Sequence, residues 1–462
     1  MPGSHLPLME EGMARWPFGP PNAGIALDFT GVPPALDELR ALVGDRWKAL
    51  PRLTQTLVAP GGPRTGLAWW TGRHRWARRD GHDLGRQVDE ADGTLRDAVR
   101  LWFHTPFPAD RPPWSLHLLR GAAEGEFSLL FRMHHSLLDG RSLTTLLRAL
   151  FDDGGPLDGA ASLAVPGPRR RTVRPAPAAG GPPGLLTAGR AVPLPHRGAR
   201  EPAYTVVRLR SDVLRAAREA ASARTATTNE VFLATVAGVL RSCLSAAEAA
   251  PPVSAASAAV SDGGRTGDGD RTGDGDRTGD GDRARAKARE RGREPGQVWL
   301  SVPVDERPDD CGEFLGNAFA NVRVPAPVTL SDPAARLTAC TGLLTPVTRP
   351  RRASEKLFES TLAAVPGATM ALAGGKIFAP AYAPAACSYV HLREQGQTLA
   401  GRPLRRLTIV PMVPPADTAT FALGGCTQGH TLSVATNSGS QDAELLAEAF
   451  LDELTLLADR TP

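Results

Sequence analysis

Cysteine is scarce in this sequence, and the few cysteines show no recognisable arrangement. The 462 residues include five, Cys243, Cys311, Cys340, Cys387 and Cys426, which are widely spaced and form no C-x-x-C pair. This pattern argues against a disulfide framework and against a zinc site built from paired cysteines. It fits a reducing compartment, so we expect a cytoplasmic protein.

Several sequence signals are also missing. The N-terminus lacks the basic and then apolar segment of a secretory signal peptide, and no apolar run approaches the roughly 18 residues that a membrane-spanning helix needs. No G-x-S-x-G motif, P-loop or dinucleotide-binding fingerprint occurs. These absences disfavour a serine hydrolase and nucleotide-dependent chemistry, and we expect no cofactor.

Positive charge is present but only locally clustered. The chain has 53 Lys and Arg against 49 Asp and Glu, a net charge of +4. Short basic runs occur at 73–79, 168–174 and 349–352, and solvated surface or linker is their simplest interpretation. The functional alternative is attraction to anionic lipid or to phosphate groups. Because no zinc-finger, β-ribbon or helix-turn-helix pattern accompanies the runs, we expect no nucleic-acid partner.

Glycine and proline, with 48 and 42 residues, are abundant and suggest long linkers. The chain is too long for one compact core, and residues 166–200 are rich in Pro and Arg. We therefore predict an N-terminal region at 1–165, a linker at 166–200 and a C-terminal region at 201–462. The hexapeptide RTGDGD repeats three times in tandem without the spacing of a calcium loop, so we expect a disordered insertion over about 250–297.

The most informative segment is RMHHSLLDGRSL at 132–143. It follows an apolar run at 126–133 that predicts a buried strand, and apolar spacing at 142–151 predicts a helix directly after it. A histidine at such a junction can accept a proton from a hydroxyl or amine as that group attacks an acyl carbon. Spacing alone leaves a structural turn open as an alternative, whereas a zinc site is disfavoured because no third ligand lies nearby.

Other polar residues have structural interpretations. Asp139 could cap the following helix or pair with a buried arginine, and Gly140 permits a close approach that a Cβ would prevent. TTNE at 227–230 predicts the start of a second helix with a capping box, in which Thr227 is the N-cap and the Glu230 side chain bonds back to the Thr227 backbone. We expect Gly316 and Asn317 to form a turn that supports a sheet.

The segment HHSLLDG resembles the HHxxxDG motif of the chloramphenicol acetyltransferase-like superfamily, which includes the condensation domains of peptide synthetases. Co-linear segments narrow the resemblance to the bacterial wax ester synthase/acyl-CoA:diacylglycerol acyltransferases. They are LPRLTQTL (50–57), HDLGRQV (82–88), PPWSLHLLRG (112–121), NEVFLATVAGVLR (229–241) and SVPVDERPDDCGEFLGN (301–317). The resemblance implies an α/β fold of two chloramphenicol acetyltransferase-like subdomains, each a mixed sheet flanked by helices, that meet at a central tunnel.

The resemblance also implies an activity. A fatty acyl group would move from acyl-CoA, a co-substrate, to the hydroxyl of a long-chain alcohol or diacylglycerol, which gives a wax ester or triacylglycerol. Two alternatives share the fold: a condensation-like enzyme that uses a carrier-protein thioester, and an inactive protein that binds lipid surfaces. Peripheral contact with a membrane or a lipid droplet is a further expectation, and no metal is expected.

The motif histidines would then differ in role. His135 would be the general base that deprotonates the acceptor hydroxyl, and His134 would support the loop. Asp139 would shape the loop, and Gly140 would keep the tunnel open beside it.

Trp114 and Asn229 are candidates for substrate contact, with core packing as the alternative for Trp114. The sequence also departs from the family pattern. The family arginine that pairs with the motif aspartate aligns with Thr54, which leaves Arg52, expected on the same strand face, as a substitute partner. The N-V-P-G-P motif of this family, which should fall near 387–396, is absent there.

Overall fold

The computed structural model describes most of the chain outside the repeat segment. Residues 250–295 of the predicted insertion, and most of the predicted linker, lie outside the described residues. The described ranges are 4–47, 49–62, 66–78, 83–120, 125–163, 171–173, 187–197, 201–220, 224–249, 296–307, 313–348, 353–392 and 397–460.

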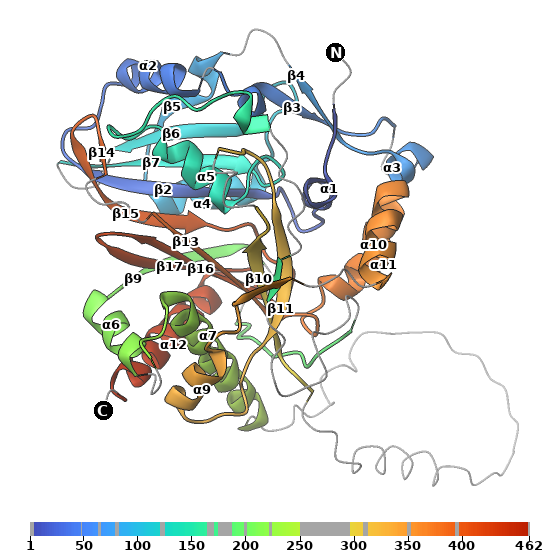
Figure 1. The fold of residues 1–462 in the computed structure, drawn as a ribbon, viewed down its shortest axis with the longest axis vertical. Helices are drawn as coiled ribbons and strands as arrows, with labels where there is room; N and C mark the ends of the chain where they lie inside the picture. Colours follow the sequence, from blue (N-terminus) through green and yellow to red (C-terminus); the bar gives the residue numbers. More distant parts are fainter. Residues whose placement is uncertain are drawn as a thin grey trace, which may run out of the picture.

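Six strands form a mixed sheet in the N-terminal half, the upper half of Figure 1. Their spatial order is β14-β15-β2-β7-β6-β5, in which β5 and β6 pair in parallel and the other neighbours are antiparallel. The strands are β2 (Asn22–Thr30), β5 (Val88–Ala91), β6 (Trp114–Arg120), β7 (Glu126–His134), β14 (Thr398–Leu399) and β15 (Arg402–Val410). Alternate residues of β2 and β7 are buried against α2 (Leu36–Trp47) and α5 (Gly140–Arg148), as the period of two along a strand requires.

A second six-stranded mixed sheet forms the C-terminal half. Its order is β11-β10-β13-β16-β17-β9, with β13 parallel to both β10 and β16. The strands are β9 (Ala203–Leu209), β10 (Trp299–Asp305), β11 (Phe319–Pro325), β13 (Ala385–His391), β16 (Ala419–Cys426) and β17 (Gly429–Thr436). In Figure 1 helices cover the face turned away from the first sheet: α6 (Ser211–Glu219), α7 (Thr228–Ala249), α9 (Pro333–Cys340) and α12 (Ser440–Ala458). The expected fold of two α/β units with mixed sheets is confirmed.

Helix α7 is the central helix of the C-terminal core. By length and composition alone, Thr228–Ala249 is apolar enough to cross a membrane, which the sequence analysis does not predict. However, 67% of its most apolar segment is buried inside the protein. It packs against α9 and α12, and we interpret it as a core helix. Its start confirms the predicted capping box, since Glu230 N lies 3.2 Å from Thr227 Oγ1 and Thr227 N donates to the Glu230 carboxylate at 2.8 Å.

The two halves are not separated cleanly along the sequence. Strands β14 and β15 come late in the chain, yet β15 pairs with β2 and places Ile409 opposite Ile25. The C-terminal region therefore returns to complete the N-terminal sheet. A small core cluster, which includes Trp102, Tyr204 and Val410, joins residues of both halves.

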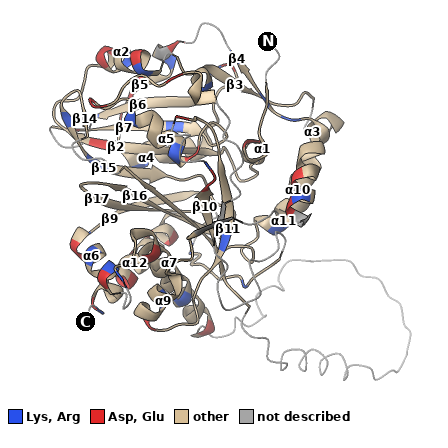
Figure 2. Ribbon diagram, viewed as in Figure 1, with Lys and Arg blue, Asp and Glu red and all other residues tan. Residues whose placement is uncertain are grey.

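Smaller elements lie around these sheets. Strands β1 (Ser4–His5), β4 (Arg75–Arg78) and β3 (Gln55–Val58) form a three-stranded sheet, and β8 (Arg171–Val173), inside the predicted linker, pairs with β12 (Pro346–Thr348). Helix α4 (Leu95–His104) follows β5, and the 3-10 turns are η1 (Pro51–Thr54), η2 (Leu84–Arg86) and η3 (Ala161–Leu163). Helices α1 (Leu8–Ala14), α3 (Leu67–Thr71), α10 (Ala353–Ala364) and α11 (Pro366–Ile377) lie at one side of the molecule (Figure 1). The surface helices α2, α6 and α10 carry residues of both charge signs (Figure 2), as expected from the near balance in composition.

Candidate active site

The HHxxxDG segment connects β7 to α5. Strand β7 ends at His134, and Asp139 is the N-cap of α5, where its carboxylate accepts a hydrogen bond of 2.9 Å from Ser142 N. Helix α5 begins at Gly140, and a Cβ built there would lie 3.0 Å from Cγ2 of Val390 on β13. The predicted strand and helix are therefore present, and the glycine allows the two halves to approach closely.

The loop between the histidines and Asp139 is held at consecutive backbone groups. His135 N donates to Pro21 O at 2.8 Å, and Asn317 Nδ2 donates to Ser136 O at 3.0 Å. Arg52 Nε donates to Leu137 O at 3.0 Å. Because buried backbone groups cost free energy when unpaired, these contacts fix one loop conformation.

Arg307, which follows β10, is the cationic partner of Asp139. Its Nη2 lies 2.8 Å from the Asp139 carboxylate, and both side chains are almost fully buried. The same nitrogen donates to Gly316 O at 3.0 Å, and Ala318 N donates to the second Asp139 oxygen at 2.8 Å. Arg307 also binds Asp305 at 3.0 Å, and Asp305 in turn pairs with Arg141. A chain of alternating charges thus joins the motif loop to the C-terminal sheet.

The prediction that Arg52 could substitute as the partner of Asp139 is wrong. Arg52 lies on η1 rather than on a strand, and its guanidinium pairs with the buried carboxylate of Glu10 on α1 and lies 4.6 Å from the Trp76 ring. Burial raises the pKa of Glu10, although Arg52 and the hydrogen bond from Trp76 oppose that shift. Arg52 therefore supports the motif loop through Leu137 O and is not the partner of Asp139.

A cavity of about 890 Å³ lies between the two halves, next to this loop. His135, Asp139 and Gly140 line it from the N-terminal half, and strands β10, β11, β13 and β16 line it from the other half. Helices α1, α10 and α11 close one side with mainly apolar side chains. This position agrees with the central tunnel that the resemblance implied.

Five of the six methionines in the chain line this cavity. They come from four separate parts of the fold: Met9 and Met13 on α1, Met133 on β7, Met370 on α11, and Met412 after β15. Methionine is unbranched and flexible, so a methionine-rich wall can adapt to apolar ligands of varied shape.

The two motif histidines have different surroundings. Burial lowers the pKa of His135. A hydrogen bond with its own backbone and the charge of Asp139 oppose this shift only in part, so the imidazole is neutral near pH 7. Its buried Nδ1 makes no hydrogen bond to another residue in the described part of the chain. Burial and the neighbouring His135 lower the pKa of His134 to about 3, and Ser136 binds its Nδ1, with Oγ at 2.7 Å and N at 3.3 Å. His134 is thus occupied by the loop, while His135 faces the cavity.

The remaining predicted residues support the fold or lie away from the cavity. Trp114 is buried in the N-terminal core, where its Nε1 donates to Leu53 O at 2.9 Å, and neither it nor Asn229 of α7 lines the cavity. Partial burial of Glu230 favours a higher pKa. Hydrogen bonds from Arg224, Thr227 and Gly342 to its carboxylate outweigh that effect and lower the pKa to about 2.

Gly316 and Asn317 do support the site. Gly316 N donates to Ser142 Oγ at 3.0 Å, and a Cβ at Gly316 would lie 2.6 Å from Cζ of Phe314. Sequence reasoning did not single out Arg307 or Glu10. The only signal for Arg307 is its place within the 301–317 segment that carries the family resemblance.

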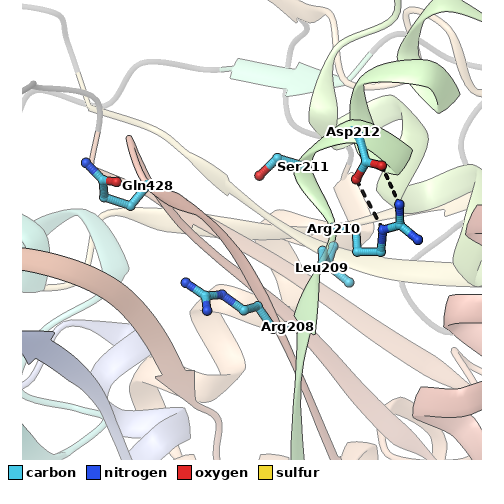
Figure 3. Close-up of a pocket in the computed structure, with 6 residues that line it drawn as sticks. All are labelled: Arg208, Leu209, Arg210, Ser211, Asp212 and Gln428. Carbon is cyan, nitrogen blue, oxygen red and sulfur yellow. Dashed lines mark hydrogen bonds and ion pairs between the residues drawn. The ribbon is translucent and has the colours of Figure 1, made fainter.

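A second, smaller hollow of about 450 Å³ lies at the junction of β9 and α6 (Figure 3). Arg208, Ser211 and Gln428 line it, and an ion pair joins Arg210 to Asp212 at 2.5 Å. None of the motif residues reaches this hollow, so it is a poor candidate for the chemistry.

Comparisons with solved structures agree on the fold. The wax ester synthase/diacylglycerol acyltransferase from Marinobacter aquaeolei VT8 is similar with a TM-score of 0.56 and 16% identity, over 99% of this chain and 100% of that one. The first condensation domain of the CDA synthetase is similar with a TM-score of 0.55 and 15% identity, over 100% of this chain and 97% of that one. At such identities the likeness shows the fold alone.

Comparisons of sequence are narrower in extent. A putative diacylglycerol O-acyltransferase of Mycobacterium tuberculosis strain H37Rv is 27% identical over 139 residues, which are 28% of this chain and 27% of that protein, so the match spans about a quarter of the relative's length. The model of the wax ester synthase/diacylglycerol acyltransferase catalytic domain matches residues 35–249. Residues 35–249 thus carry the catalytic-domain pattern of this acyltransferase family, and the resemblance expected from the motifs is confirmed.

Proposed function

We propose that this protein is an O-acyltransferase that moves a fatty acyl group from acyl-CoA to the hydroxyl of a long-chain alcohol or diacylglycerol. The observation that supports it best is the position of His135, a neutral imidazole that lines a large, mainly apolar cavity. An apolar cavity accommodates the acyl chain, and a neutral imidazole is the form that accepts a proton.

In the proposed reaction His135 takes the proton of the acceptor hydroxyl as the oxygen attacks the thioester carbonyl. The tetrahedral intermediate then collapses, the carbon–sulfur bond breaks, and the thiol leaves with the proton that His135 returns. Burial of His135 supports this role because it holds the imidazole in its basic, neutral form at the pH of the cell.

Other residues of the loop would act by positioning. Asp139 and Arg307 form a buried ion pair between the two halves, so the base stays at a fixed place relative to the cavity walls. Geometry matters here because a general base must lie within hydrogen-bond reach of the proton it removes.

The direct test is mass spectrometry of products from purified protein given a mixed pool of acyl-CoAs with alcohols and diacylglycerol. We expect esters from the native chain and a loss of turnover of about 100-fold or more in His135→Ala, the usual contribution of a general base. His104→Ala, at the exposed end of α4, is the matched control and should keep full activity. Unchanged turnover in His135→Ala would rule out this assignment.

The fold likeness to a condensation domain is as close as that to the acyltransferase, so the donor needs its own comparison. Acyl-CoA and acyl-carrier-protein thioesters with the same acyl group should be offered in parallel. Faster transfer from the carrier protein would replace the CoA donor in this proposal by a carrier-bound one.

Contact with a lipid surface is part of the same proposal. Large apolar side chains are exposed on α10 and α11, which line the cavity, and on α3, which contacts α11: Leu67 and Trp70 on α3, Leu357 on α10 and Leu372 on α11. Leu67 and Leu372 are 78% and 82% exposed, and apolar side chains gathered at one place are typical of an interaction surface. Replacement of Leu372 by Glu should weaken sedimentation with liposomes, and equal sedimentation of this variant and the native chain would contradict the assignment.

A further inference from the structure

Helix α1 forms one wall of the active-site cavity with a single face. The residues that line the cavity follow helical spacing along and just beyond the helix: Leu8, Met9, Gly12, Met13 and Trp16. The opposite face carries two buried carboxylates. Glu10 binds Arg52 and accepts a 2.7 Å hydrogen bond from Trp76 Nε1, and Glu11 accepts bonds from Arg15 and His74.

Gly12 lies within this helix although neither its backbone angles nor a close contact among the residues that the structure describes requires a glycine there. Glycine disfavours helix because it loses more backbone freedom on folding than any other residue. Gly12 is not among the glycines with positive φ, and a Cβ built on it would meet no atom of the described residues within 4 Å. By contrast, a Cβ at Gly24 on β2, which also lines the cavity, would lie 2.1 Å from Phe131 O.

We propose that Gly12 is a specificity-determining residue whose missing side chain leaves room in the cavity for the long apolar chain of a substrate. This inference rests on the proposed acyltransferase function. The open space above Gly12 belongs to the cavity that His135 lines, and Met9 and Met13 flank it with adaptable apolar side chains.

A side chain introduced at position 12 would project into the cavity rather than be absorbed by movement of α1. The buried contacts of Glu10 and Glu11 anchor the opposite face of the helix, and Arg15 further ties it to α3 through Trp69 O at 3.1 Å. The wall therefore cannot retreat without breaking buried ion pairs, which are costly to separate.

The experiment compares Gly12→Ala and Gly12→Leu with matched changes at Gly375. Gly375 also lies within a helix, α11, and an added Cβ there would have no atom of the described part of the chain within 4 Å, but Gly375 is not among the residues that line the cavity. For Gly12→Leu we expect the ratio of kcat/KM for the longest chain to that for the shortest to fall about tenfold or more, and Gly12→Ala should shift it less. Gly375→Leu should leave the ratio unchanged.

Separate series of acyl donors and of alcohol acceptors will show which chain passes Gly12. A shift in either series supports the inference. An equal loss of kcat/KM at every chain length, or an unchanged ratio in a folded Gly12→Leu protein, would overturn it. Thermal unfolding of each variant shows that it is folded, and Gly12→Ala, the better helix former, keeps the test available if the leucine variant does not fold.

A binding measurement separates this inference from the proposed reaction. A fluorescent fatty acid bound to the protein is displaced by saturated fatty acids of increasing length. If the native protein transfers no acyl group but Gly12→Leu selectively loses affinity for long fatty acids, the proposed reaction is wrong and the proposed role of Gly12 stands. If the native protein is active and both Gly12→Ala and Gly12→Leu keep its preference for acyl-chain length, only the proposed role of Gly12 is wrong.

Discussion

Two parts of the cavity wall are built in opposite ways. The motif loop from His134 to Asp139 is held by directional polar contacts, among them the buried pair of Asp139 with Arg307 and the bonds from Arg52 and Asn317 to the loop carbonyls. The wall formed by α1, α10 and α11 presents methionines and other apolar side chains, with a glycine that leaves open space. Polar contacts fix a geometry, whereas flexible apolar side chains tolerate several.

The difference follows from what each part has to do under the proposed function. A proton transfer requires the base to be within hydrogen-bond reach of one hydroxyl, so the loop must have a single conformation. A chain of methylenes makes no directional contact, so its pocket gains from adaptability. The contrast between a fixed loop and an adaptable wall can be tested at each side.

The largest effect is expected from Arg307→Ala. Removal of this guanidinium leaves the Asp139 carboxylate buried without its ion-pair partner, which should lower the free energy of unfolding by about 3–5 kcal/mol in urea titrations. Arg141→Ala removes the partly exposed end of the same charge chain and should cost only about 0.2–1 kcal/mol. Equal losses in the two variants would mean that the loop does not depend on the buried pair.

The second effect is on pH dependence. The folded-state pKa of His134, about 3, lies below the ordinary value of 6.5, so below pH 6.5 the unfolded chain binds more protons than the folded one. Stability should therefore fall as the pH drops from 6.5 towards 3, by up to about 1.4 kcal/mol per pH unit, and His134→Gln should flatten this slope. Urea titrations at several pH values measure it, and the same slope in both proteins would contradict the assignment.

Catalysis should follow the lowered pKa of His135. Because the neutral imidazole is the active form, kcat/KM should stay level as the pH falls through 6.5 and decline only at more acidic pH. A decline centred at or above pH 6.5 in the pH–rate profile would show that burial does not lower the pKa of the base.

A smaller effect is expected from Met13→Leu and Met412→Leu in the adaptable wall. These changes roughly conserve volume, so each should cost less than about 1.5 kcal/mol in stability. The branched side chains are stiffer, and the range of chain lengths accepted at near-maximal kcat/KM should become narrower. An unchanged or broader range would show that methionine flexibility does not set the tolerance.

The smallest effect is expected at the hollow of Figure 3. Arg208→Ala alters a residue that lines this hollow and not the active-site cavity, so acyl transfer should be unchanged in rate and chain-length preference. A clear loss of activity in this variant would place part of the function outside the cavity.

Local patterns in the sequence predicted much of the fold near the site. The apolar run at 126–133 became β7, the spacing after it became α5, and Thr227 with Glu230 forms the predicted capping box. These predictions succeed because strand period, helix period and capping depend on residues within a few positions of one another.

Contacts between distant residues were not predictable in the same way. Asp139 and Arg307 are 168 positions apart, and Arg52 seemed the nearer candidate only because η1 was expected to be strand. For Trp114 the sequence left substrate contact and core packing open, and the structure shows its indole in the N-terminal core. Which buried charge meets which, and which side of an aromatic faces a core or a cavity, depends on how the sheets assemble.

The sequence by itself determined the motif, its strand and helix, and the family whose catalytic domain it resembles. Only the tertiary structure decided that β14 and β15 return to the first sheet, that Arg307 holds Asp139, and that five methionines and Gly12 share one cavity with His135. The physical reason is range. Backbone periodicity and capping act between neighbours in the chain, whereas burial and ion pairing act between neighbours in space.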